Sequence, residues 1–301
     1  MESEKERYES MEFLSYLISG ISLGSIYAII ALGYTMVYGI AKMLNFAHGD
    51  VIMVGGYISF CAAFYLNLPV WVGMVLAMVV CTLLGVLIEG LAYKPLRQAA
   101  SLAVLITAIG VSYFLQNAAQ LIWGASPVVF PPIVSGQIPL GGELKLSWIT
   151  ILTVAACVVI AVVLTLFTGK SKMGKAMRAC SEDKGAAQLM GINVNRTISL
   201  TFAIGSALAA VAGVLLCSFS PTLMPTTGSM PGIKAFTAAV FGGIGSIPGA
   251  FLGGILLGVI EALAKAYIST QLSNAILFAV LIVVLLVRPA GLLGKYVPEK
   301  V

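Results

Sequence analysis

The sequence predicts an all-α fold, a polytopic transmembrane helical bundle with about eight spans, a broken half-helix and an inverted repeat. Hydrophobic residues make up 59% of the 301 residues and charged residues only 10%, whereas a soluble chain carries about 25% charge. The mean hydropathy is +1.03. Several apolar runs approach the ~20 residues that a spanning helix needs. These runs are continuous rather than alternating, which excludes a β-barrel.

The charged residues and cysteines exclude several other classes of protein. The net charge is +5, but the basic residues are scattered in short loops between apolar runs, which is typical of positive-inside anchoring and not of a nucleic-acid partner. The five cysteines show no Cys-x-x-Cys spacing and lie mostly in apolar runs. With a single histidine in the chain, we predict no metal site and no disulfide framework.

Eight apolar runs are predicted to span the membrane. They cover residues 13–41, 49–66, 70–93, 102–123, 148–167, 197–219, 248–267 and 274–287. The first is too long for the apolar core of a cleavable signal peptide and lacks a cleavage site, so we expect a retained helix. Prolines and glycines in 124–147 predict a loop there, because they cannot sustain a helix. Residues 233–247 form a shorter apolar run that ends at glycines.

Lysines and arginines predict the orientation of the chain. They gather in the polar stretch 169–196, which we therefore place in the cytoplasm. Counting spans then puts 124–147 and the acidic N-terminal segment outside the membrane. Arg288 falls inside, provided that 233–247 crosses part of the bilayer. The whole chain, 1–301, is interpreted as one transmembrane domain.

Two glycine-rich breaks interrupt apolar runs in the two halves of the sequence. The first lies in 33–56, around "NFAHG", and its non-helical part is predicted over 44–50. The second lies in 233–254, around "GGIGSIPG", and its non-helical part is predicted over 242–248. A pair of interrupted segments in two halves is the best sequence sign of a midplane transport site, since a break in the bilayer must face protein or water. The candidate residues for the breaks and the substrate pathway are Asn45, His48, Asp50, Gly242, Gly243, Gly245 and Pro248.

The polar residues of the first break have two interpretations each. His48 either hydrogen-bonds a backbone carbonyl and holds the break in shape, or lines the path. Asp50 either caps the following helix or contributes its charge to the path, as ionisable groups within a membrane often do. We expect both residues mainly to hold the geometry.

Two further carboxylates and a glycine pattern are assigned structural roles. Glu261 and Lys265 are spaced i, i+4 and predict a local ion pair near a membrane face. Glu89 is expected at the interface, with its side chain snorkelling toward water. Glycines four residues apart, such as Gly20 and Gly24, predict helices that pack closely in lipid.

The cytoplasmic stretch contains a predicted docking helix. Residues 175–190 combine helix formers with an apolar side and a charged side that includes Lys175 and Arg178. Gly191 is a helix stop signal. Such a helix either docks a partner protein or lies on the membrane surface.

A family resemblance follows from this stretch and two others. Gly185, Ala186 and Ala187 followed by Gly191 look like the EAA…G coupling motif of bacterial ABC importer permeases, with Gly185 in place of Glu and without the later proline. Together with "GSIYAIIALGYTMVYGIAKMLNFAHGDVIMVGGY" and "IKAFTAAVFGGIGSIPGAFLGGILLGVIEAL", it makes almost the whole chain resemble the branched-chain amino acid ABC transporter permease family, H-type subunit.

This resemblance implies a multi-pass permease subunit of the bacterial cytoplasmic (inner) membrane, without enzymatic activity or a bound cofactor. It implies a heterodimer with a second homologous permease, two cytoplasmic ATPase subunits on the coupling residues and an external substrate-binding protein. ATP and Mg would bind to the ATPases, since this chain has no Walker A pattern. The implied substrates are leucine, isoleucine and valine; urea or an amide, or a stand-alone secondary transporter or channel, are the alternatives.

Overall fold

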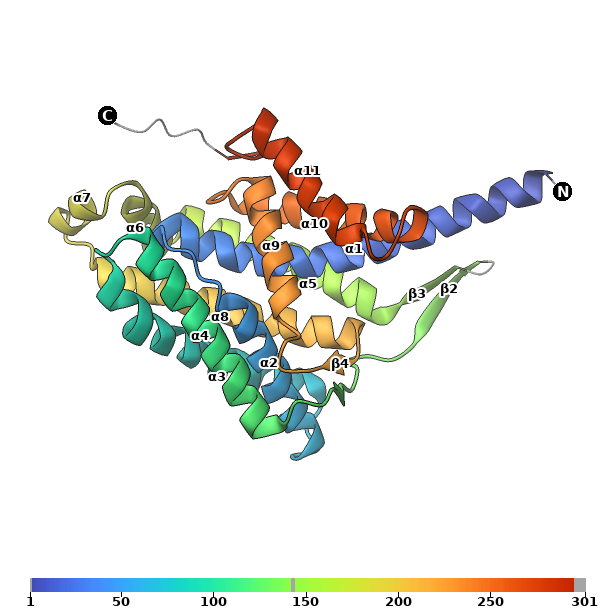
Figure 1. Cartoon of the computed structure of the whole chain (residues 1–301), viewed down its shortest axis with the longest axis horizontal. Coiled ribbons are helices and arrows are strands. Elements are labelled where there is room, and N and C mark those ends of the chain that lie inside the picture. Colours follow the sequence, from blue (N-terminus) through green and yellow to red (C-terminus); the bar gives the residue numbers. More distant parts are fainter. Residues whose placement is uncertain (1, 142–143, 295–301) are drawn as a thin grey trace.

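The computed structural model describes residues 2–141 and 144–294, and helices dominate that part of the chain (Figure 1). The α-helices are α1 (Glu2–Ala41), α2 (His48–Phe64), α3 (Val70–Ile88), α4 (Ser101–Trp123), α5 (Trp148–Lys170), α6 (Lys172–Glu182), α7 (Lys184–Leu189), α8 (Val194–Phe219), α9 (Ser229–Gly242), α10 (Ile247–Tyr267) and α11 (Ser273–Val287). A π-helical turn, η1 (Glu89–Tyr93), and a 3-10 turn, η2 (Lys94–Leu96), follow α3.

Six of the described helices are long and apolar enough to cross a membrane. Their apolar parts are Met11–Ala41, Val70–Leu96, Ser101–Trp123, Trp148–Lys170, Val194–Phe219 and Ile247–Tyr267. Helices α2 and α11 are apolar but shorter, with 17 and 15 residues. The chain is therefore a multi-pass helical membrane protein with at least six helices of spanning length among its described residues.

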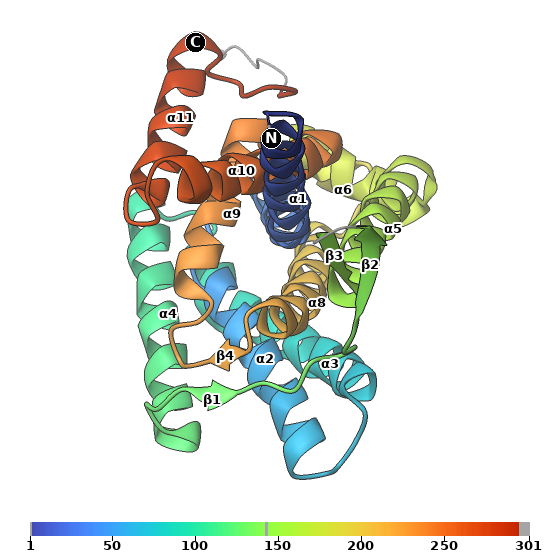
Figure 2. The same cartoon turned by 90° about the vertical axis from the view of Figure 1, so that its right-hand side faces the viewer.

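Helix α1 lies at the centre of the bundle. Figure 2 looks along α1 from its N-terminal end, with α10, α5 and α8 around it, and α1 also contacts α9. Helix α10 crosses α1 closely: a Cβ atom added to Gly24 would lie 2.7 Å from the carbonyl oxygen of Ile255. The predicted close packing at glycines four residues apart is thus confirmed at Gly24. Helix α4 lies at the edge of the bundle (Figure 2).

The segment 124–147 contains no helix among its described residues, as predicted, but it is not wholly irregular. It carries the strands β1 (Val128–Val129), β2 (Gln137–Gly141) and β3 (Leu144–Ser147). Strands β2 and β3 form an antiparallel pair, and β1 pairs with β4 (Thr222–Leu223) from the distant loop before α9. Strands this short carry no alternating pattern long enough to be recognised in the sequence.

Candidate functional site

The first break covers residues 42–47, a little earlier than the 44–50 expected from the sequence. Helix α1 ends at Ala41, and Lys42 adopts a left-handed conformation with φ of 57°. Helix α2 then begins at His48. His48 and Asp50 therefore belong to the first turn of α2.

His48 packs against α1 and is fully buried. Its ring hydrogen-bonds the backbone carbonyl of Ile30 and lies 4.6 Å from the ring of Tyr34, centroid to centroid. A Cβ atom on Gly33 would lie 2.7 Å from its Nε2 atom. The interpretation that His48 bonds a backbone carbonyl is confirmed. Since Gly33 precedes Ala41 by eight residues, the histidine lies about 12 Å in from the end of α1.

Asp50 is not the N-cap residue of α2; its carboxylate accepts a hydrogen bond from its own backbone N–H in the first turn. The N-cap residue is Ala47, whose side chain makes no capping hydrogen bond. The buried carboxylate of Asp50 also accepts a hydrogen bond from Nε2 of Gln116, at 2.9 Å. The same nitrogen lies 3.3 Å from the hydroxyl oxygen of Ser229. Asp50 thus joins α2 to α4 and to the start of α9.

Asn45 lies within the first break and is buried. Its Oδ1 atom accepts a hydrogen bond from the hydroxyl of Tyr93, at 2.9 Å. The Tyr93 ring packs against Phe202 of α8, with 5.2 Å between centroids. Asn45 therefore fixes the middle of the break to η1.

The second break covers residues 243–246, between α9 and α10. Gly243 and Gly245 have φ values of 107° and 92°, which a residue with a side chain rarely adopts. The Ser246 hydroxyl caps α10 by accepting from the N–H of Gly249 at 3.2 Å. Pro248 stands in the first turn of α10, where its missing N–H is no loss. The sequence therefore located this break correctly, within the expected 242–248.

The second break lies near the end of α1 and not beside its middle. A Cβ atom on Gly39 would lie 3.1 Å from the Cα of Gly245, and Gly39 is two residues from the last residue of α1. The expected midplane position of this break stays a prediction. Both breaks approach the α1 end that also contacts α6.

Residues 169–196 contain two helices where the sequence predicted one over 175–190. Asp183 separates α6 from α7 because its backbone is extended (φ −152°, ψ 115°). Its Oδ1 atom accepts from the N–H groups of Gly185 and Ala186, at 2.7 and 3.0 Å, and caps α7. Gly191 has φ of 80° and follows the end of α7, so the predicted stop is confirmed. A capping aspartate here went unrecognised in the sequence.

The predicted coupling residues separate into exposed and buried groups. Lys175, Arg178, Gly185 and Ala186 are exposed. Ala187, expected on the docking surface, is buried in a cluster with Met36, Ile40, Met177 and Cys180. Burial raises the pKa of the Cys180 thiol.

The exposed apolar residues of the α7 region belong to the apolar side that the sequence predicted for the docking helix. Leu189 and Met190 are 90% and 82% exposed. A groove between α6 and α7 has Ala179 and Met190 in its lining, with Lys175 and Glu182 among its charged residues. Exposed apolar side chains next to charges are typical of a surface that binds another protein.

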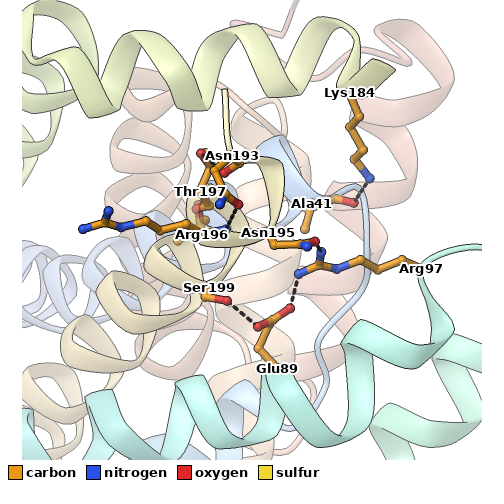
Figure 3. A network of polar contacts seen from close by, with 10 residues as sticks. Ala41, Glu89, Arg97, Lys184, Asn193, Asn195, Arg196, Thr197 and Ser199 are labelled. Carbon is orange, nitrogen blue, oxygen red and sulfur yellow. Dashed lines mark hydrogen bonds and ion pairs between the residues drawn. The ribbon is translucent and has the colours of Figure 1, made fainter. Parts of the chain in front are cut away.

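Glu89 belongs to a buried polar network that the sequence did not reveal (Figure 3). The expected snorkelling position is wrong, since Glu89 is only 1% exposed. Its carboxylate pairs with Arg97 and accepts from the hydroxyl of Ser199 at 2.6 Å. Arg97 also hydrogen-bonds Asn195 at the start of α8. In the sequence, the spacing of Glu89 and Arg97 by about two helical turns could have indicated that the two side chains pair.

Glu261 centres a second buried cluster. Its ion pair with Lys265 is confirmed, at 2.6 Å, and Glu261 is fully buried. Its carboxylate also pairs with Nζ of Lys234, at 2.7 Å, and accepts from the hydroxyl of Tyr27, at 2.9 Å. The cluster joins α1, α9 and α10, a contact between distant segments that no local spacing indicates.

Within residues 2–141 and 144–294, no group of three or more His, Cys, Asp or Glu residues is arranged to hold a metal ion. All five cysteines are free. The polar groups described above bind one another. Their contacts connect separate helices and hold the first break against its neighbours.

Comparisons with known proteins place this arrangement in a family. A family model described as the permease component of a branched-chain amino acid transport system matches residues 16–285. The high-affinity branched-chain amino acid transport system permease protein LivH of Escherichia coli (strain K12) is 49% identical over 302 residues, covering 96% of this chain and 98% of LivH.

Two further relatives and one solved structure are similar. BraD, the corresponding permease protein of Pseudomonas aeruginosa, is 45% identical, covering 97% of this chain and 99% of BraD. The probable branched-chain permease LivH of Methanocaldococcus jannaschii is 30% identical, covering 79% and 76%. PsaBC from Streptococcus pneumoniae in complex with Fab is 16% identical with a TM-score of 0.48, covering 94% of each chain, which is too distant to support a conclusion. From the family match and the two closer relatives, the chain belongs to the permease component family of branched-chain amino acid transport systems.

Proposed function

We propose that the chain is the membrane-spanning permease subunit of an ATP-driven importer that carries leucine, isoleucine and valine across the cytoplasmic membrane. The observation that supports this most is the 49% identity to LivH of Escherichia coli over nearly the full length of both chains. A permease for urea or an amide is the alternative within the same class. A secondary transporter driven by ions is the alternative outside it.

We also propose the partners. Two ATPase subunits, which bind ATP and Mg, dock on the α6–α7 pair; a second homologous permease completes a heterodimer, and an external binding protein delivers the substrate. The exposed Leu189 and Met190 beside charged residues support the docking position. The exposed coupling residues Lys175, Arg178, Gly185 and Ala186 surround this position along α6 and α7.

The membrane arrangement is a further part of the proposal. The shorter helices α2 and α11 also lie in the bilayer, which makes eight spans, and α9 with its glycine break forms the half-helix. Residues 169–196 face the cytoplasm and 124–147 the outside, within one transmembrane domain over 1–301. The two breaks are corresponding parts of an inverted repeat. Shared features support this: each break separates an apolar helix from a helix that begins with glycine in its first turn.

The breaks shape the substrate pathway in this proposal. Asn45, His48 and Asp50 hold the first break through contacts to η1, α1 and α4. Gly242, Gly243, Gly245 and Pro248 allow the second break to turn close to α1. Ordered polar contacts at a break satisfy backbone and side-chain groups that lipid cannot.

Reconstitution tests the function directly. The chain is purified with its second permease, ATPases and binding protein, placed in proteoliposomes, and assayed for ATP hydrolysis and solute uptake. Leucine, isoleucine and valine should stimulate both, whereas urea and acetamide should not. Stimulation by urea alone would favour the first alternative, and uptake without ATPase subunits, driven by an ion gradient, would favour the second.

A further inference from the structure

The end of α1 is held by a side chain from α7. Lys184, the first residue of α7, donates a hydrogen bond from Nζ to the backbone carbonyl of Ala41, at 2.8 Å (Figure 3). Ala41 is the last residue of α1, and the final carbonyls of a helix lack partners within it. Ala41 is also fully buried, so its carbonyl needs a donor from the protein. Lys184 supplies that donor one residue before the first break.

The Lys184 contact is directed at the break and not at the body of α1. A second contact between the α6–α7 pair and α1 is apolar, with Ala187 in a cluster with Met36 and Ile40. That cluster packs against the side of α1, whereas Lys184 reaches its terminal carbonyl. Because Lys42 has φ of 57°, the chain changes direction immediately after the contact. A displacement of α7 along α1 would therefore act on the break.

The middle and the far side of the break are anchored to other elements. Asn45 is bound to Tyr93 of η1 at 2.9 Å, and His48 is bound to the carbonyl of Ile30 in the middle of α1. The segment 42–47 is thus held at one end by α7 and at the other by groups that do not belong to the α6–α7 pair. A relative movement of the two anchors must change the conformation of the segment between them.

The charges around Lys184 make this contact weaker than an ion pair. Its acceptor at Ala41 is a neutral carbonyl, and burial together with the nearby positive charges of Arg97 and Lys42 lowers the pKa of Lys184. Arg97 already binds Glu89 and Asn195. A cation on a neutral acceptor beside other cations is bound less tightly than one paired with a carboxylate. The contact can therefore open and re-form without separating opposite charges.

We propose that Lys184 is the positioning residue through which movement of the α6–α7 pair reaches the first break. The inference rests on the proposed function, since it requires ATPase subunits that move the pair. In each ATP cycle α7 shifts, the Lys184–Ala41 contact follows or opens, and the segment 42–47, which includes Asn45, changes its conformation next to Asp50. The break then alternates with nucleotide state, which is what a gate of the substrate path needs.

Three substitutions test this role in the complete reconstituted transporter. Lys184→Met keeps the aliphatic length and removes the donor, whereas Lys184→Arg keeps a cationic donor. Lys170→Met is the matched control, because Lys170 is an exposed cation at the end of α5 with no role in the proposed contact. In Lys184→Met, leucine uptake per ATP hydrolysed should fall about tenfold, the order expected when a charge-assisted hydrogen bond is lost. Lys184→Arg should restore at least half of the coupling, and Lys170→Met should leave it unchanged.

A thiol reporter separates positioning from a merely structural role. Leu44→Cys is introduced into a chain whose five native cysteines are replaced, and the rate of labelling by a polar maleimide is measured with and without ATP. The rate should depend on ATP when Lys184 is present and should not when it is methionine. The amount of folded complex is measured for each variant by size-exclusion chromatography.

The outcomes distinguish this inference from the proposed function. Normal coupling in Lys184→Met, or an ATP-dependent labelling rate that persists in it, would overturn the role of Lys184 and leave the importer assignment intact. If the Lys184→Arg complex folds but its coupling is not restored, that result would also count against the role of Lys184. If the unmodified complex shows no ATP-dependent uptake at all, the proposed function itself is wrong and the inference falls with it.

Discussion

The carboxylate of Asp50 lies inside an apolar bundle and is held by a neutral donor. Gln116 of α4 donates to it at 2.9 Å and approaches Ser229 of α9 with the same nitrogen. The ion pairs among the described residues involve Glu89 and Glu261, and Asp50 is in none of them. A buried carboxylate satisfied by amides and hydroxyls can be replaced by an amide of the same shape. This favours a structural role for Asp50.

We predict that Asp50→Asn retains most transport, because its Oδ1 atom can still accept from Gln116. Asp50→Ala should instead reduce the amount of folded protein, since it removes the shortest hydrogen bond of the Gln116 amide, one to a charged acceptor, at a cost of about 1–3 kcal/mol. Uptake and folded yield of both variants check this in the reconstituted complex. If Asp50→Asn assembles and hydrolyses ATP but does not transport, the charge itself serves the path.

Glu261 presents the opposite case, a carboxylate that neutralises two lysines. Lys234 is buried with it, while the side chain of Lys265 is 40% exposed and able to reach water. Removing one partner of a buried pair leaves an uncompensated charge, which costs about 3–5 kcal/mol.

We predict that Glu261→Gln lowers the free energy of unfolding by roughly that amount, and that adding Lys234→Met recovers a large part of it. Lys265→Met alone should have a small effect, because the exposed end of Lys265 is solvated, and it serves as the control. Thermal or denaturant unfolding in detergent gives the stability of the unmodified chain, Glu261→Gln, the double variant with Lys234→Met, and Lys265→Met. A loss below about 1 kcal/mol in Glu261→Gln, the range of exposed ion pairs, would show that the cluster is not desolvated.

At the scale of elements, the crossing of α1 and α10 depends on backbone contact. A Cβ atom at Gly24 would lie 2.7 Å from the Ile255 carbonyl oxygen and 2.8 Å from its Cα. A backbone cannot move aside as a side chain can. Gly110 on α4 offers a matched control, because no atom lies within 4 Å of a Cβ added there.

We predict opposite effects for two chemically identical substitutions. Gly24→Ala should destabilise the chain by about 1–3 kcal/mol through overpacking, whereas Gly110→Ala should stabilise it by about 0.5–1 kcal/mol because alanine is the better helix former. The melting temperature of the purified chain in detergent shows whether each substitution raises or lowers its stability. Equal effects at the two positions would contradict the observed packing.

The division of the cytoplasmic segment into α6 and α7 changes which residue should test docking. Ala187 is buried against α1, so a glutamate there would disturb the fold and not only the docking surface. Leu189 is 90% exposed on the surface.

We predict that Leu189→Glu uncouples ATP hydrolysis from uptake and leaves stability within about 0.5 kcal/mol, as expected for an exposed position. Val129→Glu is the control: it makes the same kind of change at a residue 79% exposed in β1, on the proposed external side. Uptake and hydrolysis are compared in assembled complexes. Normal transport by Leu189→Glu would place the ATPase contact elsewhere.

For the whole molecule, the sequence predicted the helical membrane class and most helix boundaries because composition and apolar runs are local properties. The run 102–123 became α4, Ser101–Trp123, and 248–267 became α10, Ile247–Tyr267. The breaks were found because glycine and proline mark them. Buried ion clusters were missed: whether Glu89 or Glu261 faces lipid, water or another helix depends on segments far away in the chain. The split at Asp183 was missed because both sides read as helix formers.

We predict that the two polar segments face opposite sides of the membrane. In a cysteine-free chain, Ser135→Cys should react with an impermeant maleimide added outside intact cells, whereas Lys172→Cys should react only after the cells are opened. Both positions are exposed, so a lack of reaction reflects sidedness. Labelling of Lys172→Cys from outside would reverse the proposed topology.

The distance in sequence between α1 and α10 has a consequence for biosynthesis. Tyr27 and Glu261 meet across 234 residues. At about 5–20 residues per second, Glu261 is synthesised roughly 12–47 s after Tyr27. During that interval the glycine face of α1 is in the membrane without the helix that covers it. A nascent chain that stalls before α10 would leave this face uncovered, where membrane proteases and chaperones can distinguish an unfinished chain from a completed one.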